Sequence, residues 1–217
     1  MTITQPEGFL ARPPAGGGPA ILVLHAWWGL NDFFRSFCSR LANEGFLVFA
    51  PDLFHGAVAA TIEEAKQLIS NEQPEKVAED VAAALDFLRG HEAARGGPVG
   101  VIGFSFGAYY AVQLSCLRPD TVRAAVLFYG IGEGSFDKSR AAYLGHFGEK
   151  DEYEPAPGVQ DLESALRKAG RPVDFHTYPG TGHWFFESSR ADAYHPQAAE
   201  AAWERTLTFL RRELVKR

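Results

Sequence analysis

Four short, almost wholly aliphatic runs stand out in the hydrophobic pattern of the chain. They occupy residues 20–25, 46–50, 99–104 and 124–129. Apolar runs of this length are typical of strands that are buried on both faces, as in parallel sheets. Two further runs, at residues 141–147 and 172–178, predict additional strands. The pattern therefore predicts a mostly parallel sheet.

Between these runs, apolar residues recur at helical spacing. The first such segment, residues 33–42, follows the capping residues Asn31 and Asp32 and ends before Gly45. Other predicted helices begin at Pro74 and Gly107 or lie at residues 160–168 and 199–214. Repeated alternation of strand and helix predicts an α/β fold, with a doubly wound, mostly parallel sheet and helices on both faces.

Two stretches are less regular. Residues 53–73 contain only a short helical pattern at 61–69, and we expect them to form a rim or a movable lid. The short N-terminal piece, residues 8–12, is not assigned to any element.

Length and composition bound the class of protein. The 217 residues fit one domain, residues 1–217, because domains average roughly 150 residues. A hydrophobic share of 46% beside 22% charged residues is typical of globular proteins. The net charge is −6, and no basic run is long enough to hold a phosphate backbone, so we expect no nucleic acid partner.

The two cysteines, Cys38 and Cys116, have no second ligand-type residue at metal spacing. We therefore expect reduced thiols, no metal site and no disulfide. The N-terminus lacks the pattern of a secretory signal, and no apolar run approaches the roughly 18 residues of a membrane span. These features predict a cytoplasmic protein with no membrane partner.

The pentapeptide Gly103–Gly107 has the pattern G-x-S-x-G and lies between a predicted buried strand and a predicted helix. A serine on such a tight turn is exposed at the sheet edge. The helix N-terminus and the Phe106 N–H are then available to a developing oxyanion. The alternative interpretation of this pentapeptide is an ordinary glycine-rich turn. A nucleophilic serine would also need a base, and the base would need an acid to orient it.

Candidates for the acid and the base follow Ser105 in the chain order expected for this fold: serine, acid, histidine. His183 follows the last predicted strand on a glycine-rich loop, and Asp151 directly follows the preceding strand. Glu149 is a nearby rival for the acid. Coincidence becomes improbable when Ser105, Asp151 and His183 each follow a strand in this order.

Further motifs lie at the ends of the predicted elements. They are His25–Asn31, Ala50–Leu53, the pentapeptide around Ser105, Gly148–Asp151 followed by Pro155, Gly182–His183 and Glu204–Leu207. With these motifs in series, nearly the whole chain resembles the dienelactone hydrolase family of the α/β-hydrolase superfamily. By this resemblance, Ser105 matches the nucleophile, Asp151 the acid and His183 the base. Trp27 and Phe106 match the residues whose backbone N–H groups form the oxyanion hole.

The chain departs from the family pattern in two ways. Family members usually carry a cysteine at the position of Ser105 and a glutamate at the position of Ala26, where the carboxylate helps to activate the thiol. The two changes are consistent, because a serine that passes its proton to His183 does not need that carboxylate. Glu187 stands about where the family places an arginine that pairs with the substrate carboxylate, and we expect it to repel an anionic dienelactone.

Large aromatic residues lie on loops after the strands, at the edge where doubly wound sheets bind ligands. Trp28, Phe54 and Trp184 are the predicted substrate-binding residues, beside Trp27 and Phe106. They imply a fairly apolar, neutral ester as ligand, although each could simply belong to the core. Two histidines near this edge, His25 and His55, are explained as well by structural hydrogen bonding as by catalysis.

We therefore predict a serine carboxylic ester hydrolase that acts through an acyl-enzyme on a small to medium, largely neutral ester, without cofactor or metal. One alternative keeps a dienelactone or another lactone as substrate, with charge compensation by Arg35 or Arg190. A second alternative is a non-catalytic ligand-binding protein on the same fold. The chain is expected to be a monomer or a homodimer.

Overall fold

One seven-stranded sheet runs through the molecule, in the order β1-β3-β2-β4-β5-β6-β7. The computed structural model describes residues 4–215, so residues 1–3 and 216–217 of the predicted domain 1–217 lie outside the described residues. The strands are β1 (Gly8–Ala11), β2 (Ala20–Leu24), β3 (Leu47–Pro51), β4 (Val99–Phe104), β5 (Val122–Phe128), β6 (Ala142–Gly148) and β7 (Val173–Tyr178). The strands from β2 to β7 pair in parallel, which confirms the predicted sheet.

The N-terminal piece that the sequence leaves unassigned is an edge strand. Residues Gly8–Ala11 form β1, which pairs antiparallel with β3. Most of this strand is only half-buried, so it lacks the continuous apolar run that marks the central strands.

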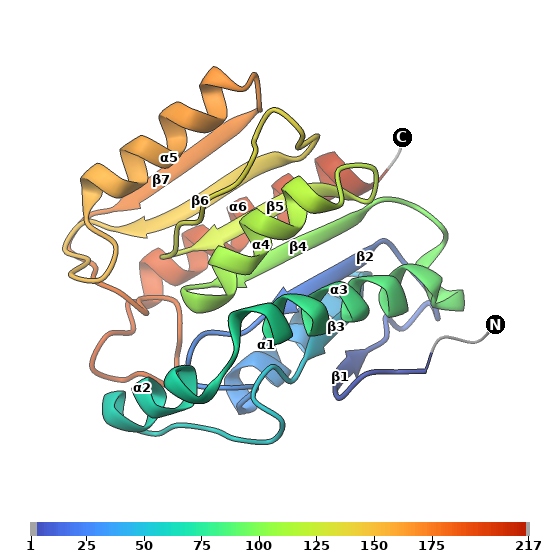
Figure 1. Ribbon diagram of the computed structural model, residues 1–217, viewed down its shortest axis with the longest axis horizontal. Helices are drawn as coiled ribbons and strands as arrows, with labels where there is room; N and C mark the ends of the chain where they lie inside the picture. Colours follow the sequence, from blue (N-terminus) through green and yellow to red (C-terminus); the bar gives the residue numbers. More distant parts are fainter. Residues whose placement is uncertain (1–3, 216–217) are drawn as a thin grey trace.

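Helices cover both faces of the sheet, as predicted (Figure 1). They are α1 (Asp32–Asn43), α2 (Ile62–Asn71), α3 (Pro74–Gly90), α4 (Phe106–Leu117), α5 (Ala156–Lys168) and α6 (Pro196–Leu214), with a short 3₁₀ helix at Glu92–Ala94. Side chains of α1 and α6 form one core with the sheet, and side chains of α3, α4 and α5 form a second core on the opposite face. α5 begins earlier than the predicted range 160–168, because Pro157 lies in its first turn, where a missing N–H costs no helical hydrogen bond.

The irregular stretch 53–73 contains α2, close to the predicted pattern at 61–69. A capping box starts this helix: the Thr61 hydroxyl accepts from Glu64 N, and the Glu64 carboxylate accepts from Thr61 N. In Figure 1, α2 lies near the long segment between β7 and α6, at the end of the sheet toward which the parallel strands run. The stretch therefore forms part of the rim there, and its motion as a lid stays a prediction.

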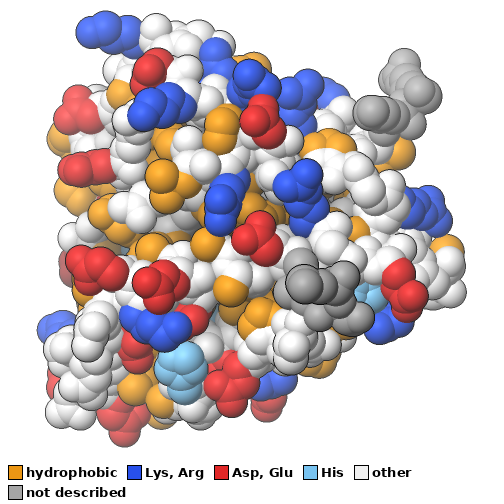
Figure 2. All heavy atoms as spheres, turned by 45° about the vertical axis from the view of Figure 1, so that its right-hand side comes forward, with side chains coloured by type: hydrophobic (Ala, Val, Ile, Leu, Met, Phe, Trp, Pro, Cys, Tyr) orange, Lys and Arg blue, Asp and Glu red, His pale blue; other side chains and the backbone are white. Residues whose placement is uncertain are grey.

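The surface carries charges of both signs. On the face drawn in Figure 2, Lys and Arg side chains are interspersed with Asp and Glu. Within residues 4–215, no helix has the length and apolar character needed to cross a membrane. Over the same residues, no group of three or more His, Cys, Asp or Glu side chains is arranged to hold a metal ion. Cys38 and Cys116 are buried free thiols.

Candidate active site

Ser105 alone makes the turn between β4 and α4. Its backbone has φ +48° and ψ −111°, a conformation that residues with a Cβ rarely adopt. The Ser105 N–H donates a 2.9 Å hydrogen bond to Phe128 O on β5, which helps to hold this strained turn. The predicted strand–turn–helix setting of the serine is therefore present, with its hydroxyl at the sheet edge.

The glycines on either side of Ser105 allow three backbone segments to meet. A Cβ on Gly103 would lie 2.4 Å from Gly107 O, and a Cβ on Gly107 would lie 2.3 Å from Leu24 O. Neither site can accept a side chain without movement of the backbone. The contact at Gly107 also places the start of α4 against the end of β2.

The three residues predicted as nucleophile, acid and base lie in one hydrogen-bonded chain. His183 Nε2 is 2.8 Å from Ser105 Oγ, and His183 Nδ1 is 2.7 Å from Asp151 Oδ2. Asp151 Oδ1 also accepts hydrogen bonds of 2.9 Å from the backbone N–H groups of Tyr153 and Glu154. Because the carboxylate can only accept, the imidazole proton stays on Nδ1, and Nε2 is free to receive the serine proton.

The rival acid, Glu149, is engaged elsewhere. Its carboxylate accepts a 2.8 Å hydrogen bond from Gly180 N and so braces the loop that leads to His183. The structure thus brings Asp151, and not Glu149, into contact with the imidazole.

The backbone groups predicted as oxyanion donors come from two segments that touch. Trp27 lies in the loop after β2, and its N–H has no hydrogen-bond partner among residues 4–215. Phe106 is the first residue of α4, so its N–H has no acceptor in a preceding helical turn. The contact of Gly107 with the end of β2 brings these two segments together beside Ser105.

Aromatic rings form a wall beside His183. Trp27, Trp28 and Trp184 have ring centroids 5.2–5.8 Å apart. Tyr153, which the sequence analysis did not single out, lies 5.0 Å from the ring of His183 and is 45% exposed. The sequence signal for Tyr153 is its position shortly after Asp151, in the turn whose backbone N–H groups bind the Asp151 carboxylate.

The predicted substrate-binding residues belong to this region but are mostly covered. Trp28 is 2% exposed, Phe54 3% and Trp184 6%. The ring of Phe54 packs against that of Phe106 at 5.4 Å. The partly exposed rings of Trp27 and Tyr153 therefore offer a ligand more surface than these three do.

The two arginines considered for charge compensation lie in different places. The guanidinium carbon of Arg190 lies 4.3 Å from the ring centroid of Trp28, and the Arg190 side chain is 18% exposed. It borders a surface hollow of about 610 Å³ that Trp28 also lines, together with residues 59–60 and 189–192. Arg35 instead lies over the ring of Phe9, next to the edge strand β1. Of the two, only Arg190 adjoins the aromatic wall.

The expectation that Glu187 repels an anionic substrate is wrong. Its side chain is fully buried, and one carboxyl oxygen accepts a 2.8 Å hydrogen bond from the Tyr129 hydroxyl. Burial raises the pKa of Glu187 to about 8, so the group is mostly uncharged at pH 7. Sequence could not show this, because it depends on the packing of the loop after β7 against Tyr129.

Glu187→Gln is expected to remove a pH dependence of stability. The folded state keeps the Glu187 proton up to pH about 8, whereas the unfolded chain loses it near 4.5. Wild type therefore loses free energy of unfolding as pH rises through this window, by on the order of 5 kcal/mol for this group. Glutamine can still accept from Tyr129 and does not titrate. Urea unfolding of both proteins at pH 5 and 8 should show that the free energy of unfolding falls less in the variant than in the wild type. Equal decreases in the two proteins would contradict a buried neutral carboxyl at Glu187.

Known proteins are similar in sequence to this chain over most of its length. The model of the "Dienelactone hydrolase family" matches residues 7–214. A "Putative carboxymethylenebutenolidase" from Aquifex aeolicus is 31% identical, over 94% of this chain and 92% of the relative. A "Probable 2-oxo-3-(5-oxofuran-2-ylidene)propanoate lactonase" from Bradyrhizobium sp is 30% identical, over 94% and 88%.

A solved structure agrees with this assignment. The crystal structure of a "Putative Dienelactone Hydrolase" from Klebsiella pneumoniae superposes on this chain with a TM-score of 0.80 and 28% identity. The superposition covers 91% of this chain and 89% of the other, which confirms the predicted α/β-hydrolase fold. Membership in a family of hydrolases sets aside the alternative of a non-catalytic binding protein. The chain belongs to the dienelactone hydrolase family and is a hydrolase that acts on ester bonds.

Proposed function

We propose that the protein is a serine carboxylic ester hydrolase that works through an acyl-enzyme on Ser105. The hydrogen-bonded chain from Ser105 through His183 to Asp151, with distances of 2.8 and 2.7 Å, carries this proposal. His183 Nε2 takes the hydroxyl proton as Ser105 Oγ attacks the ester carbonyl carbon. Asp151 stays ionised, holds the Nδ1–H and stabilises the imidazolium.

The N–H groups of Trp27 and Phe106 are the donors proposed for the oxyanion of the tetrahedral intermediate. His183 then gives its proton to the leaving alcohol, which leaves the acyl group on Ser105. Water, deprotonated by the same imidazole, attacks the acyl-enzyme and releases the acid. Every step uses side chains and backbone N–H groups of this protein and water, so the proposal includes no cofactor.

The aromatic wall favours a small to medium, largely neutral ester as substrate. Trp27 and Tyr153 offer apolar ring surface next to His183, at a ring distance of 5.6 Å from one another. Such surface favours burial of an apolar acyl or alcohol group.

Lactone hydrolysis is the second candidate. Relatives named as a carboxymethylenebutenolidase and a lactonase favour it. The neutral state of Glu187 removes one objection to an anionic lactone, and Arg190 next to Trp28 supplies a nearby positive charge. The chemistry at Ser105 would be the same, except that the leaving alcohol stays joined to the acyl group.

Two measurements on the wild type test these proposals. Aryl acetates with different leaving groups are hydrolysed in the presence of a competing alcohol, and a dienelactone is assayed beside them. A shared acyl-enzyme predicts the same ratio of acetate to transesterified product for every leaving group. A ratio that changes with the leaving group would contradict a common covalent intermediate. A dienelactone rate far above the ester rates would move lactone hydrolysis to first place.

A further inference from the structure

His25 lies directly after β2, at the start of the loop that carries Trp27, and the mechanism above gives it no role. Its side chain is 0% exposed and contacts the rings of Phe34 and Phe54. Both ring nitrogens nevertheless have a polar partner. Nδ1 is 2.7 Å from Ala26 O, and Nε2 is 3.1 Å from the backbone nitrogen of Leu53.

These two contacts fix the tautomer of the imidazole. The Leu53 N–H can only donate, so Nε2 must accept with its lone pair. The ring proton of His25 is therefore on Nδ1, which donates to Ala26 O. Burial lowers the pKa of His25 to about 4, so the ring keeps this neutral form at pH 7.

The hydrogen bond to Ala26 O acts on the Trp27 N–H, because both groups belong to one peptide unit. Peptide bonds within residues 4–215 are all trans, so the carbonyl and the N–H of this unit point in opposite directions. Ala26 O accepts from His25 Nδ1 and, at 3.2 Å, from Gly29 N. Holding the carbonyl in this way fixes the direction of the Trp27 N–H and polarises it as a donor.

The second contact of His25 leads to the other proposed donor. Leu53 is followed by Phe54, whose ring lies 5.1 Å from the imidazole and 5.4 Å from the ring of Phe106. The backbone N–H of Phe106 is the second group proposed for the oxyanion. The His25 imidazole thus contacts the Trp27 loop directly and reaches Phe106 only through the ring of Phe54.

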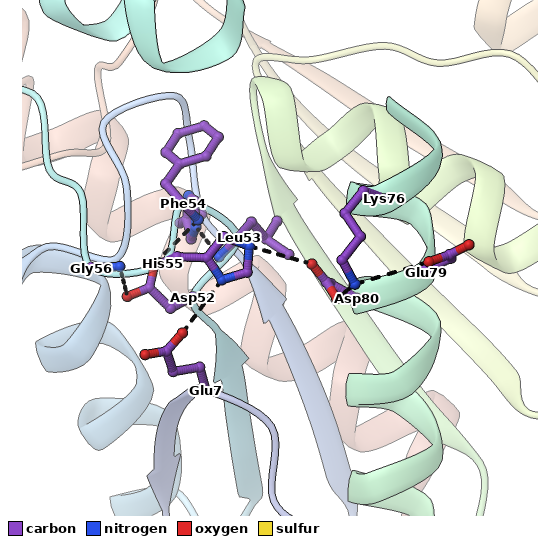
Figure 3. Close-up of polar contacts among 10 residues, drawn as sticks. Glu7, Asp52, Leu53, Phe54, His55, Gly56, Lys76, Glu79 and Asp80 are labelled. Atoms are coloured by element: carbon purple, nitrogen blue, oxygen red, sulfur yellow. Dashed lines mark hydrogen bonds and ion pairs between the residues drawn. The ribbon is translucent and has the colours of Figure 1, made fainter. Parts of the chain in front are cut away.

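The turn that presents the Leu53 N–H is itself held in place (Figure 3). Asp52 accepts a 2.9 Å hydrogen bond from Gly56 N across the turn. His55 Nδ1 lies 3.4 Å from a carboxylate oxygen of Glu7, and His55 Nε2 lies 3.7 Å from a carboxylate oxygen of Asp80 on α3. The Leu53 N–H is therefore a defined partner for the imidazole.

We infer that His25 is a positioning residue of the oxyanion hole, which aims the Trp27 N–H through the Ala26 carbonyl and anchors the segment beside Phe106 through Leu53. This inference rests on the proposed function, since it requires the Trp27 N–H to bind the oxyanion. It assigns separate tasks to the two ring nitrogens, and these tasks can be separated by substitution.

His25→Gln and His25→Asn form the matched pair. The glutamine amide reaches the place of Nε2 and can accept from Leu53, but it loses the donor to Ala26 O. The asparagine amide lies at the place of Nδ1 and can donate to Ala26 O, but it cannot reach Leu53. His146→Gln is the control, because His146 is also buried but binds the hydroxyls of Tyr178 and Thr206.

Turnover of one aryl ester is measured per active site, titrated with a fluorophosphonate. His25→Gln should lower kcat by about 10- to 100-fold with little change in KM, less than the roughly 10²–10³-fold loss of a whole oxyanion donor. His25→Asn should recover most of that loss, and His146→Gln should leave kcat per active site unchanged. Equal kcat losses in the two His25 variants, or a normal kcat in His25→Gln, would overturn the inference.

The outcome separates the inference from the proposed function. A wild type that hydrolyses esters beside an unimpaired His25→Gln variant rejects only the role of His25. A wild type without a common acyl-enzyme rejects the proposed function, and the role of His25 with it. A ¹⁵N spectrum of histidine-labelled wild type gives a readout that does not use activity. It should show a neutral ring protonated at Nδ1 that is lost in His25→Gln, and a ring protonated at Nε2 would overturn the inference.

Discussion

Ser105→Ala is expected to lower kcat for esters by about 10⁴- to 10⁶-fold, since it removes the hydroxyl proposed to form the acyl-enzyme. In the present geometry, Ser105 Oγ is the atom that His183 Nε2 contacts, at 2.8 Å. Removal of this oxygen leaves the imidazole without a nucleophile to activate. The remaining rate would come from binding and from water in place of the hydroxyl. Single-turnover kinetics with an aryl acetate measure the loss directly.

The same variant should fold like the wild type. Alanine keeps the Cβ, so it keeps the strain of a residue at φ +48° and changes only the contact with His183. Circular dichroism and the thermal midpoint therefore serve as its controls. A well-folded Ser105→Ala protein with more than a few per cent of wild-type kcat would show that the nucleophile lies elsewhere.

Local sequence encodes the strand ends and the tight turn on which the candidate site is built. Ser105 follows a continuous apolar strand and is flanked by Gly103 and Gly107, and the close backbone approaches at both glycines explain why the motif has this form. The strand ends also bring Asp151 and His183 near Ser105, because parallel strands bring their carboxyl ends to one edge.

The parts that depend on packing could not be predicted. Whether Glu187 faces a substrate or the core is decided by its fit against Tyr129, and its charge follows from that burial. The exposure of Tyr153 beside His183 depends in the same way on how the turn after β6 folds around Asp151. A residue's position along the chain does not carry this information.

Asp151→Asn is expected to lower kcat by about 10⁴-fold, a larger loss than that of any other variant proposed above except Ser105→Ala. Asp151 accepts hydrogen bonds from the backbone N–H groups of Tyr153 and Glu154 as well as from His183. An asparagine that keeps its oxygen toward these two N–H groups turns its NH₂ toward His183 Nδ1. The imidazole must then carry its proton on Nε2, where it cannot accept the proton of Ser105.

Glu149→Gln is the matched control, because it makes the same carboxylate-to-amide change in the same loop. Glutamine can still accept from Gly180 N, so kcat should stay close to that of the wild type. Stopped-flow measurement of acylation in both variants separates the two acids, and the neutral imidazole of Asp151→Asn should appear as an Nε2–H in a ¹⁵N spectrum. If Glu149→Gln lost as much activity as Asp151→Asn, the loss would reflect disturbance of the loop and not the tautomer of His183. A loss confined to Asp151→Asn, with both proteins equally stable, would assign the acid to Asp151.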